Sequence, residues 1–326
     1  MQSMKGALSK LVSVVIVLSL ASGCEARLDL EGVENTLKQS VRRTDQLLSI
    51  EQLSDGSLIM FGNDGLLLTK SIGNQDWHRT QLRQDNISPN FIDSTVCNDQ
   101  TIVALAYENQ LWVSSDNGAN WTTQVIPTQE NLQAVDCTST GDIWVVGSFS
   151  TLMKTEDRGL NWTTNSMQED SMLTQVSFIS ENTGYAVGEF GLLLKTEDSG
   201  ANWELLDPIS DDFYPLAAYF QDDQNGWVGG LQGVIMKTID GGRSWQRQVV
   251  NSEVPIYNFV SAGVMYATGD RGTVLKNSGN EWNPVDVPEI PTYYRTGVVL
   301  DDNSMLLAGG WGVLTTVSLN NTSVKE

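Results

Sequence analysis

Short apolar runs recur along the whole chain and alternate with turn-forming residues. Typical runs are residues 143–146 (IWVV) and 192–194 (LLL), and glycine, asparagine, aspartate or serine separate them from their neighbours. The runs lack the 3.6-residue period of an amphipathic helix. The pattern therefore predicts many short β-strands and an all-β fold.

One eight-residue motif, S/T-x-D-x-G-x-x-W, occurs four times without gaps, and degenerate copies end at Trp77 and Trp282. An aspartate side chain can accept hydrogen bonds from nearby backbone N–H groups, and glycine tolerates positive φ, so the motif is typical of a hairpin turn. We predict structural roles, and no catalytic or metal role, for its aspartates and tryptophans: Asp116 and Trp121, Asp157 and Trp162, Asp198 and Trp203, and Asp240 and Trp245.

A second turn, with a G-x-x-G core, precedes these motifs. Its copies are residues 62–65, 188–191, 230–233, 269–272 and 309–312, with altered versions at 106–109 and 147–150. A G-x-x-G loop can bind phosphate where it opens a helix, but every copy here leads into a predicted strand. Seven repeats of four strands, about forty residues apart, predict a seven-bladed β-propeller.

The seventh repeat stops after residue 316 and lacks the aspartate-containing turn. An unassigned segment, residues 36–43, precedes the first full repeat. We expect this segment to supply the missing strand and close the ring, because closure removes exposed sheet edges. The predicted propeller spans residues 36–318, and residues 319–326 form a C-terminal tail.

The first 23 residues predict a signal peptide. Lys5 and Lys10 precede or flank a ten-residue apolar run, 11–20, which is too short to span a bilayer. Small residues then precede Cys24, and this arrangement resembles a bacterial lipoprotein signal, in which Cys24 would be acylated. The alternative is an ordinary secretory peptide with a chance cysteine. By the same resemblance, Glu25 implies sorting to the outer membrane, where we expect the protein to face the periplasm with residues 24–35 as a tether.

The net charge is −21, and it becomes −23 once residues 1–23, which carry two lysines and no acid, are removed. Such a surface repels phosphate backbones. We therefore expect no nucleic-acid partner.

Two cysteines, Cys97 and Cys137, remain in the mature chain. They fall 24 and 25 residues before Trp121 and Trp162, which suggests the same position in neighbouring repeats. An oxidising compartment would allow a disulfide. Equivalent residues on adjacent inner strands of a propeller are commonly too far apart for one, so two buried free thiols are the favoured interpretation.

The eight-residue motif resembles the Asp-box, or bacterial neuraminidase repeat. A longer unit at residues 178–203, with its neighbour at 220–229, resembles the photosystem II stability and assembly factor family. The resemblance covers about residues 45–316 and implies a seven-bladed propeller that acts as a non-enzymatic assembly factor in the envelope or thylakoid lumen. The arginine-rich patch attributed to photosynthetic members is not matched, because only Arg271 stands at a G-x-x-G tip.

Two other functions stay open: a glycoside hydrolase of sialidase type, since sialidases carry the same turns, and a carbohydrate-binding propeller. Against the hydrolase, no F/Y-R-I-P-like segment opens the chain, and Arg158 and Arg243 lie within the structural turns. The single histidine, His78, has no obvious catalytic partner and leaves no histidine-type metal site. We therefore predict no enzymatic activity, no catalytic residue, no metal and no cofactor.

The two kinds of turn lie on opposite faces of a propeller. The face of the G-x-x-G turns would present Tyr107, Phe149, Phe190, Leu231, Arg271 and Trp311. Exposed aromatic residues on loops of a rigid scaffold favour binding, whereas the alternative is that these rings pack together or fill the central channel. The sequence thus predicts a non-enzymatic outer-membrane lipoprotein that binds another envelope protein as an assembly or accessory factor and contacts the membrane only through its lipid.

Overall fold

A computed structural model describes residues 31–288, 290–301 and 304–319. Residues up to Gln39 belong to one unit, whose described part contains the helix α2 (Glu31–Leu37), and residues from Ser40 onward form a second unit. The predicted signal peptide, Cys24 and most of the proposed tether lie outside the described residues. So do residues 320–326 of the proposed tail.

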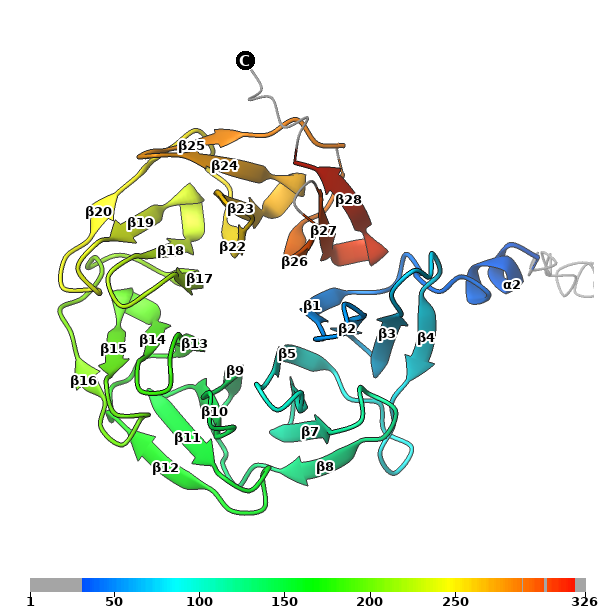
Figure 1. Cartoon of the computed structure of the whole chain (residues 1–326), viewed down its shortest axis with the longest axis horizontal. Coiled ribbons are helices and arrows are strands. Elements are labelled where there is room, and N and C mark those ends of the chain that lie inside the picture. Colours follow the sequence, from blue (N-terminus) through cyan, green and yellow to red (C-terminus); the bar gives the residue numbers. More distant parts are fainter. Residues whose placement is uncertain (1–30, 289, 302–303, 320–326) are drawn as a thin grey trace, which may run out of the picture. The chain divides into compact units, whose positions relative to one another are not determined.

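Seven mainly antiparallel sheets surround a common centre in the second unit (Figure 1). The first four blades, each from its innermost to its outermost strand, are β1 (Leu47–Gln52), β2 (Leu58–Gly62), β3 (Leu66–Lys70) and β4 (His78–Gln81); β5 (Phe91–Val96), β6 (Ile102–Ala106), β7 (Gln110–Ser114) and β8 (Thr122–Val125); β9 (Leu132–Cys137), β10 (Ile143–Gly147), β11 (Thr151–Thr155) and β12 (Thr163–Ser166); and β13 (Leu173–Phe178), β14 (Gly184–Gly188), β15 (Leu193–Thr196) and β16 (Glu204–Leu205).

The remaining blades are less regular. They comprise β17 (Pro215–Phe220), β18 (Gly226–Gly230), β19 (Ile235–Thr238) and β20 (Gln246–Arg247); β22 (Ile256–Ser261), β23 (Met265–Gly269), β24 (Val274–Ser278) and β25 (Glu281–Pro284), with β21 (Val249–Val250) added outside β25; and β26 (Tyr294–Asp301), β27 (Ser304–Gly309) and β28 (Leu314–Ser318). Four short 3-10 turns, η1 (Glu189–Gly191), η2 (Leu231–Gly233), η3 (Asp270–Gly272) and η4 (Gly310–Gly312), follow the second strands of blades four to seven. The predicted all-β, seven-bladed propeller is confirmed.

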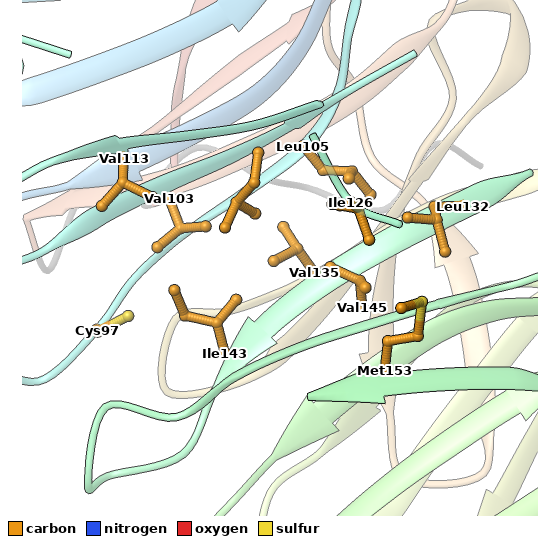
Figure 2. Packing of buried hydrophobic residues seen from close by; sticks show 11 residues of the cluster. Cys97, Val103, Leu105, Val113, Ile126, Leu132, Val135, Ile143, Val145 and Met153 are labelled. Atoms are coloured by element: carbon orange, nitrogen blue, oxygen red, sulfur yellow. The ribbon is translucent and has the colours of Figure 1, made fainter. Parts of the chain in front are cut away.

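The second strand of each blade is enclosed on both sides, which explains the continuous apolar runs in the sequence. All five residues of β6 and of β10 are buried. Between blades two and three, Val103 and Leu105 of β6 share one apolar cluster with Val135 of β9 and Val145 of β10 (Figure 2). The core therefore consists of layers between neighbouring blades, which hold each blade at a fixed angle to the next.

The expected closure by an N-terminal strand is wrong for the described residues. The seventh sheet contains only β26, β27 and β28, whereas residues 36 and 37 belong to α2 and residues 38–43 form no strand. Blades seven and one instead pack directly, with β1 beside β26 (Figure 1) and a shared apolar cluster.

The favoured free-thiol interpretation is also wrong, because Cys97 and Cys137 form a disulfide with their Cα atoms 5.4 Å apart. Cys137 pairs with Ile143 in the ladder, whereas Val96, and not Cys97, holds the corresponding position opposite Ile102. Cys97 is therefore displaced by one residue. Because successive side chains in an extended chain point to opposite sides, this displacement turns the two sulfurs toward each other across the interface of blades two and three.

Candidate binding face

The G-x-x-G turns and the blade-to-blade loops lie on one face, which we call the tip face. Backbone hydrogen bonds join each turn to the preceding loop: Tyr107 N donates to Asn90 O (2.9 Å), and Glu189 N donates to Met172 O (2.9 Å). The segment before β1 also holds the blade-seven tip, since Gly312 N donates to Asp45 O at 2.7 Å. The tips are thus held on a rigid frame.

Each tip is a tight turn with two successive residues in the left-handed region. In blade four, Leu192 N donates to Glu189 O (3.2 Å), and the two residues between them, Phe190 and Gly191, have φ of 60° and 69°. This is the geometry of a type I′ turn, which favours asparagine, aspartate and glycine. This backbone explains the last glycine of the G-x-x-G core, which tolerates positive φ. It does not explain the bulky residue before that glycine, which does not.

Three aromatic residues occupy that disfavoured position. Phe149, Phe190 and Trp311 have φ of 53°, 60° and 57° and are 54%, 64% and 47% exposed. A bulky side chain in the left-handed region costs on the order of 1 kcal/mol or more. Their exposure means that burial regains little of this free energy. These rings are therefore retained at a cost to the stability of the fold.

The other predicted tip residues are also exposed. Arg271 occupies the same left-handed position of its turn (φ 52°). Tyr107 and Leu231 stand one residue before that position in their own turns and are 59% and 44% exposed. Among the described residues, no close ring pair includes Tyr107, Phe149, Phe190 or Trp311. Trp311 has Arg43 over its ring at 5.7 Å. The aromatic tips thus form separate contact points around the ring and do not pack on one another.

A second aromatic group lies where the innermost strands of blades six and seven begin. The rings of Tyr257 and Tyr293 are 5.7 Å apart, Arg295 lies 5.9 Å from the Tyr257 ring, and the Tyr293 hydroxyl donates to Gln46 Oε1 at 2.8 Å. The sequence counted Arg295 only among the arginines that a sialidase-type site could use and did not place it at a binding face, because it belongs to neither turn motif. Only the fold places it beside these tyrosines.

The Asp-box turns on the opposite face use their polar groups internally. In blade two, Asp116 Oδ1 accepts hydrogen bonds from Ser114 Oγ (2.9 Å) and Asn120 N (2.8 Å), and Trp121 Nε1 donates to Gly118 O (3.0 Å). The hydrogen bonds from Asn120 hold the pKa of Asp116 below its usual range. The same aspartate contacts recur in the turns of Asp157, Asp198 and Asp240.

Three carboxylates on the innermost strands have displaced pKa values. Burial raises the pKa of Glu51 to about 8, helped by the nearby Asp93 carboxylate, and burial raises the pKa values of Asp93 and Asp136 to about 6. Asp93 and Asp136 each accept a backbone N–H of the following blade, at 3.0 and 2.7 Å. Their oxygens therefore already serve as links between blades.

No group of three or more histidine, cysteine, aspartate or glutamate side chains within the described ranges could hold a metal ion. His78 is exposed on β4, the outermost strand of the first blade, and two strands separate β4 from the innermost strand β1. No helix in the described part of the chain is long and apolar enough to cross a membrane.

Comparison with known proteins identifies one related family. Residues 114–213 match the family described as Photosynthesis system II assembly factor YCF48. No curated protein sequence matches the chain. The family resemblance expected from the repeats is confirmed over that segment.

Solved structures share the fold at low sequence identity. "YCF48 bound to D1 peptide" is 15% identical, covers 84% of this chain and 91% of its own and has a TM-score of 0.67. YCF48 from Cyanidioschyzon merolae is 16% identical, covers 85% and 97%, and has a TM-score of 0.68. Virginiamycin B lyase from Staphylococcus aureus, in a catalytically inactive variant with one histidine replaced, is 10% identical, covers 85% and 96%, and has a TM-score of 0.74. At these identities the likeness concerns the fold alone.

Proposed function

We propose that this chain is a lipid-anchored, non-enzymatic protein of a bacterial outer membrane that binds another envelope protein through its tip face, as an assembly or accessory factor. The observation that carries the proposal is the set of exposed aromatic residues in left-handed backbone, Phe149, Phe190 and Trp311. Strained backbone that the core does not require is typical of functional sites, and exposed aromatics on a rigid frame are typical anchors of protein interfaces.

Similarity to YCF48 supports a protein partner, because one YCF48 structure holds a D1 peptide. A catalytic role has less support. The lyase is inactivated when one histidine is replaced, whereas the single histidine of this chain lies exposed on an outermost strand. The displaced carboxylates of the innermost strands already accept hydrogen bonds from backbone N–H or serine hydroxyl groups, which leaves them poorly suited to acid–base work on a bound sugar.

The lipid anchor rests on the sequence around Cys24. Replacing Cys24 with serine should block acylation and leave an unprocessed precursor, detectable by gel migration and by loss of labelled palmitate. A Cys24→Ser protein that still fractionates with membranes and migrates like the wild type would contradict the anchor. Glu25→Asp should shift the protein toward the inner membrane if the host follows the usual sorting rule.

The binding role is tested by affinity capture from detergent-solubilised envelopes, with partners identified by mass spectrometry. The triple variant Phe149→Asn, Phe190→Asn and Trp311→Asn should lose the captured partner, because asparagine fits the left-handed backbone but removes the rings. The matched control carries Leu160→Asn and Ile239→Asn, which are exposed apolar residues in the Asp-box turns. Equal capture by the wild type and the triple variant would disprove a binding role of these tips.

A further inference from the structure

The chain takes an unusual path between blades five and six. The fourth strand has four residues in blades one to three and only two in blades four and five, where β20 ends after Gln246–Arg247. The next strand, β21, then joins the sixth sheet in parallel with β25, and Val249 N donates to Asn280 O at 3.1 Å. The segment 247–253 thus crosses from one blade to the next and is fixed at both ends.

This crossing leaves a groove on the tip face. Its first part, about 620 Å³, extends from the blade-five tip at Gln232 along Arg247 and Gln248 to Ser252. A second hollow of about 260 Å³ is lined by Asn251, Ser252 and the blade-six tip residue Arg271. Because Ser252 lines both, the two hollows lie next to each other between the tips of blades five and six, and we call the two together the groove.

The walls of the groove are rigid. A Cβ atom on Gly233 would collide with Ser252 O, and one on Gly272 would collide with Ile290 Cγ1, so both tips press closely on the loops beneath them. Asn251 Nδ2 donates to Asn283 Oδ1 at 2.7 Å and ties the crossing segment to β25. A ligand would therefore meet a preformed surface, which lowers the entropic cost of binding.

Two guanidinium groups stand along this groove without partners. Arg247 and Arg271 are exposed, and the ion pairs found among the described residues involve neither of them. In a chain with a net charge of −21, a cation has many potential carboxylate partners, so two free arginines lining one groove are notable. Glu253 also lines the first hollow. The arrangement favours a ligand that brings carboxylates to the two ends.

One buried amide lines the same groove. Gln248 is 5% exposed, and its Oε1 accepts no hydrogen bond from the described residues, while Nε2 reaches only Gln246 O at 3.5 Å. An unpaired buried acceptor destabilises the fold, because the desolvation of its oxygen is not compensated by a hydrogen bond. A backbone N–H of a bound peptide, reaching this side chain after a small rotation of its amide, would supply the missing donor.

We propose that this groove binds an extended acidic segment of a partner protein, with carboxylates at Arg247 and Arg271 and a peptide group at Gln248. The inference rests on the proposed protein-binding function and specifies the chemistry of the partner. Since the protein as a whole repels acidic ligands, such a segment would be selected by this groove and not by overall charge.

Fluorescence anisotropy on the full-length protein tests this. The probes are labelled nonapeptides of alternating Asp and Ala, of alternating Ser and Ala and of alternating Lys and Ala, plus a ten-nucleotide thymidine oligomer. The variant Arg247→Gln with Arg271→Gln is compared with a charge-matched control, Arg158→Gln with Arg243→Gln, in the Asp-box turns. We expect the Asp–Ala peptide to bind the wild type and the control alike, and to bind the groove variant about fivefold to tenfold more weakly, with the difference reduced in 0.5 M salt.

The proposal is overturned if the Asp–Ala peptide does not bind, if the Ser–Ala peptide or the oligonucleotide binds the groove as well, or if the control loses as much affinity as the groove variant. The variant Gln248→Leu provides a second test, since it removes the amide that would bind the peptide backbone. It should weaken the Asp–Ala peptide without changing the salt dependence. Should the groove variant bind normally while the aromatic tip variant loses its captured partner, the groove inference fails and the proposed function stands.

Discussion

Asp136 in the third blade accepts a hydrogen bond from the backbone N–H of Phe178 in the fourth, with 2.7 Å between Oδ2 and N. Asp93 in the second blade does the same for Val135 N in the third, at 3.0 Å. In the first blade, Glu51 Oε1 accepts a hydrogen bond from Ser94 Oγ of the second at 3.1 Å. Carboxylates therefore link blades one to four beside the centre of the ring, where the innermost strands have no further strand to pair with.

The burial of these carboxylates, which outweighs the opposing effect of the hydrogen bonds they accept, predicts that stability falls as the pH rises. Burial raises the pKa of Glu51 to about 8, so the folded protein holds this proton more tightly than the unfolded chain, where the pKa is about 4.5. The resulting stabilisation is fully present below pH 4.5 and is lost as the pH rises through 8. The pKa values of Asp93 and Asp136 are raised to about 6, so the stabilisation from these two residues is lost at lower pH than that from Glu51.

Glu51→Gln keeps the hydrogen-bonding shape and removes the ionisation. Glu51 is half-buried, so we discount the full shift for solvent screening and expect the variant to gain about 1–3 kcal/mol over the wild type at pH 8 relative to pH 5.5. Urea unfolding at the two pH values measures this difference. Glu181→Gln, an exposed glutamate in the loop after β13, serves as the control and should show no such gain. An identical pH dependence of Glu51→Gln and the wild type would contradict the prediction.

The disulfide predicts a second measurable property. Cys97 and Cys137 enclose a loop of 40 residues, and closing a loop of that length restricts the unfolded chain by about 3–4 kcal/mol in the entropic account. The double variant Cys97→Ser and Cys137→Ser should be less stable than the wild type by that order. Thiol titration of the unfolded, unreduced mature protein should detect neither residue. Two reactive thiols there would show that the bridge is not formed.

How much the sequence reveals differs between repeated and unique features. The repeats predicted the propeller because the Asp-box turn needs its own aspartate and glycine and the G-x-x-G turn its own glycines, so at least one of the two motifs, complete or degenerate, marks each blade. The disulfide was missed because spacing from Trp121 and Trp162 hides a one-residue displacement between Cys97 and the ladder position of Val96. The groove was invisible for a similar reason: nothing local in residues 246–250 reveals that β21 leaves its own blade and pairs with β25.

The Asp-box tryptophans predict a third result, because they pack between blades. The Trp203 ring lies 5.5 Å from the ring of Trp144 in the preceding blade and 5.9 Å from that of Phe178. Trp203→Ala should lower the free energy of unfolding by about 3 kcal/mol, and Asp198→Ala by about 1–2 kcal/mol through loss of its turn hydrogen bonds. Leu205→Ala, an exposed apolar residue of the same blade, should cost much less. A loss of partner capture at full stability in Trp203→Ala would contradict a structural role.

The strained tips give the fourth prediction, which separates a binding role from a packing role. Phe149→Asn and Phe190→Asn should each keep or raise the free energy of unfolding, by up to about 1 kcal/mol, because asparagine tolerates the left-handed backbone that phenylalanine resists. Trp311→Asn should be nearly neutral, since relief of strain is offset by loss of the contact with Arg43. Leu160→Asn, in an Asp-box turn, removes an exposed apolar side chain outside the left-handed region and should bring no gain. Thermal melts and urea titrations measure all four variants. If the two phenylalanine variants instead lose several kcal/mol, the rings are packing residues, and the binding surface must be sought elsewhere on the tip face.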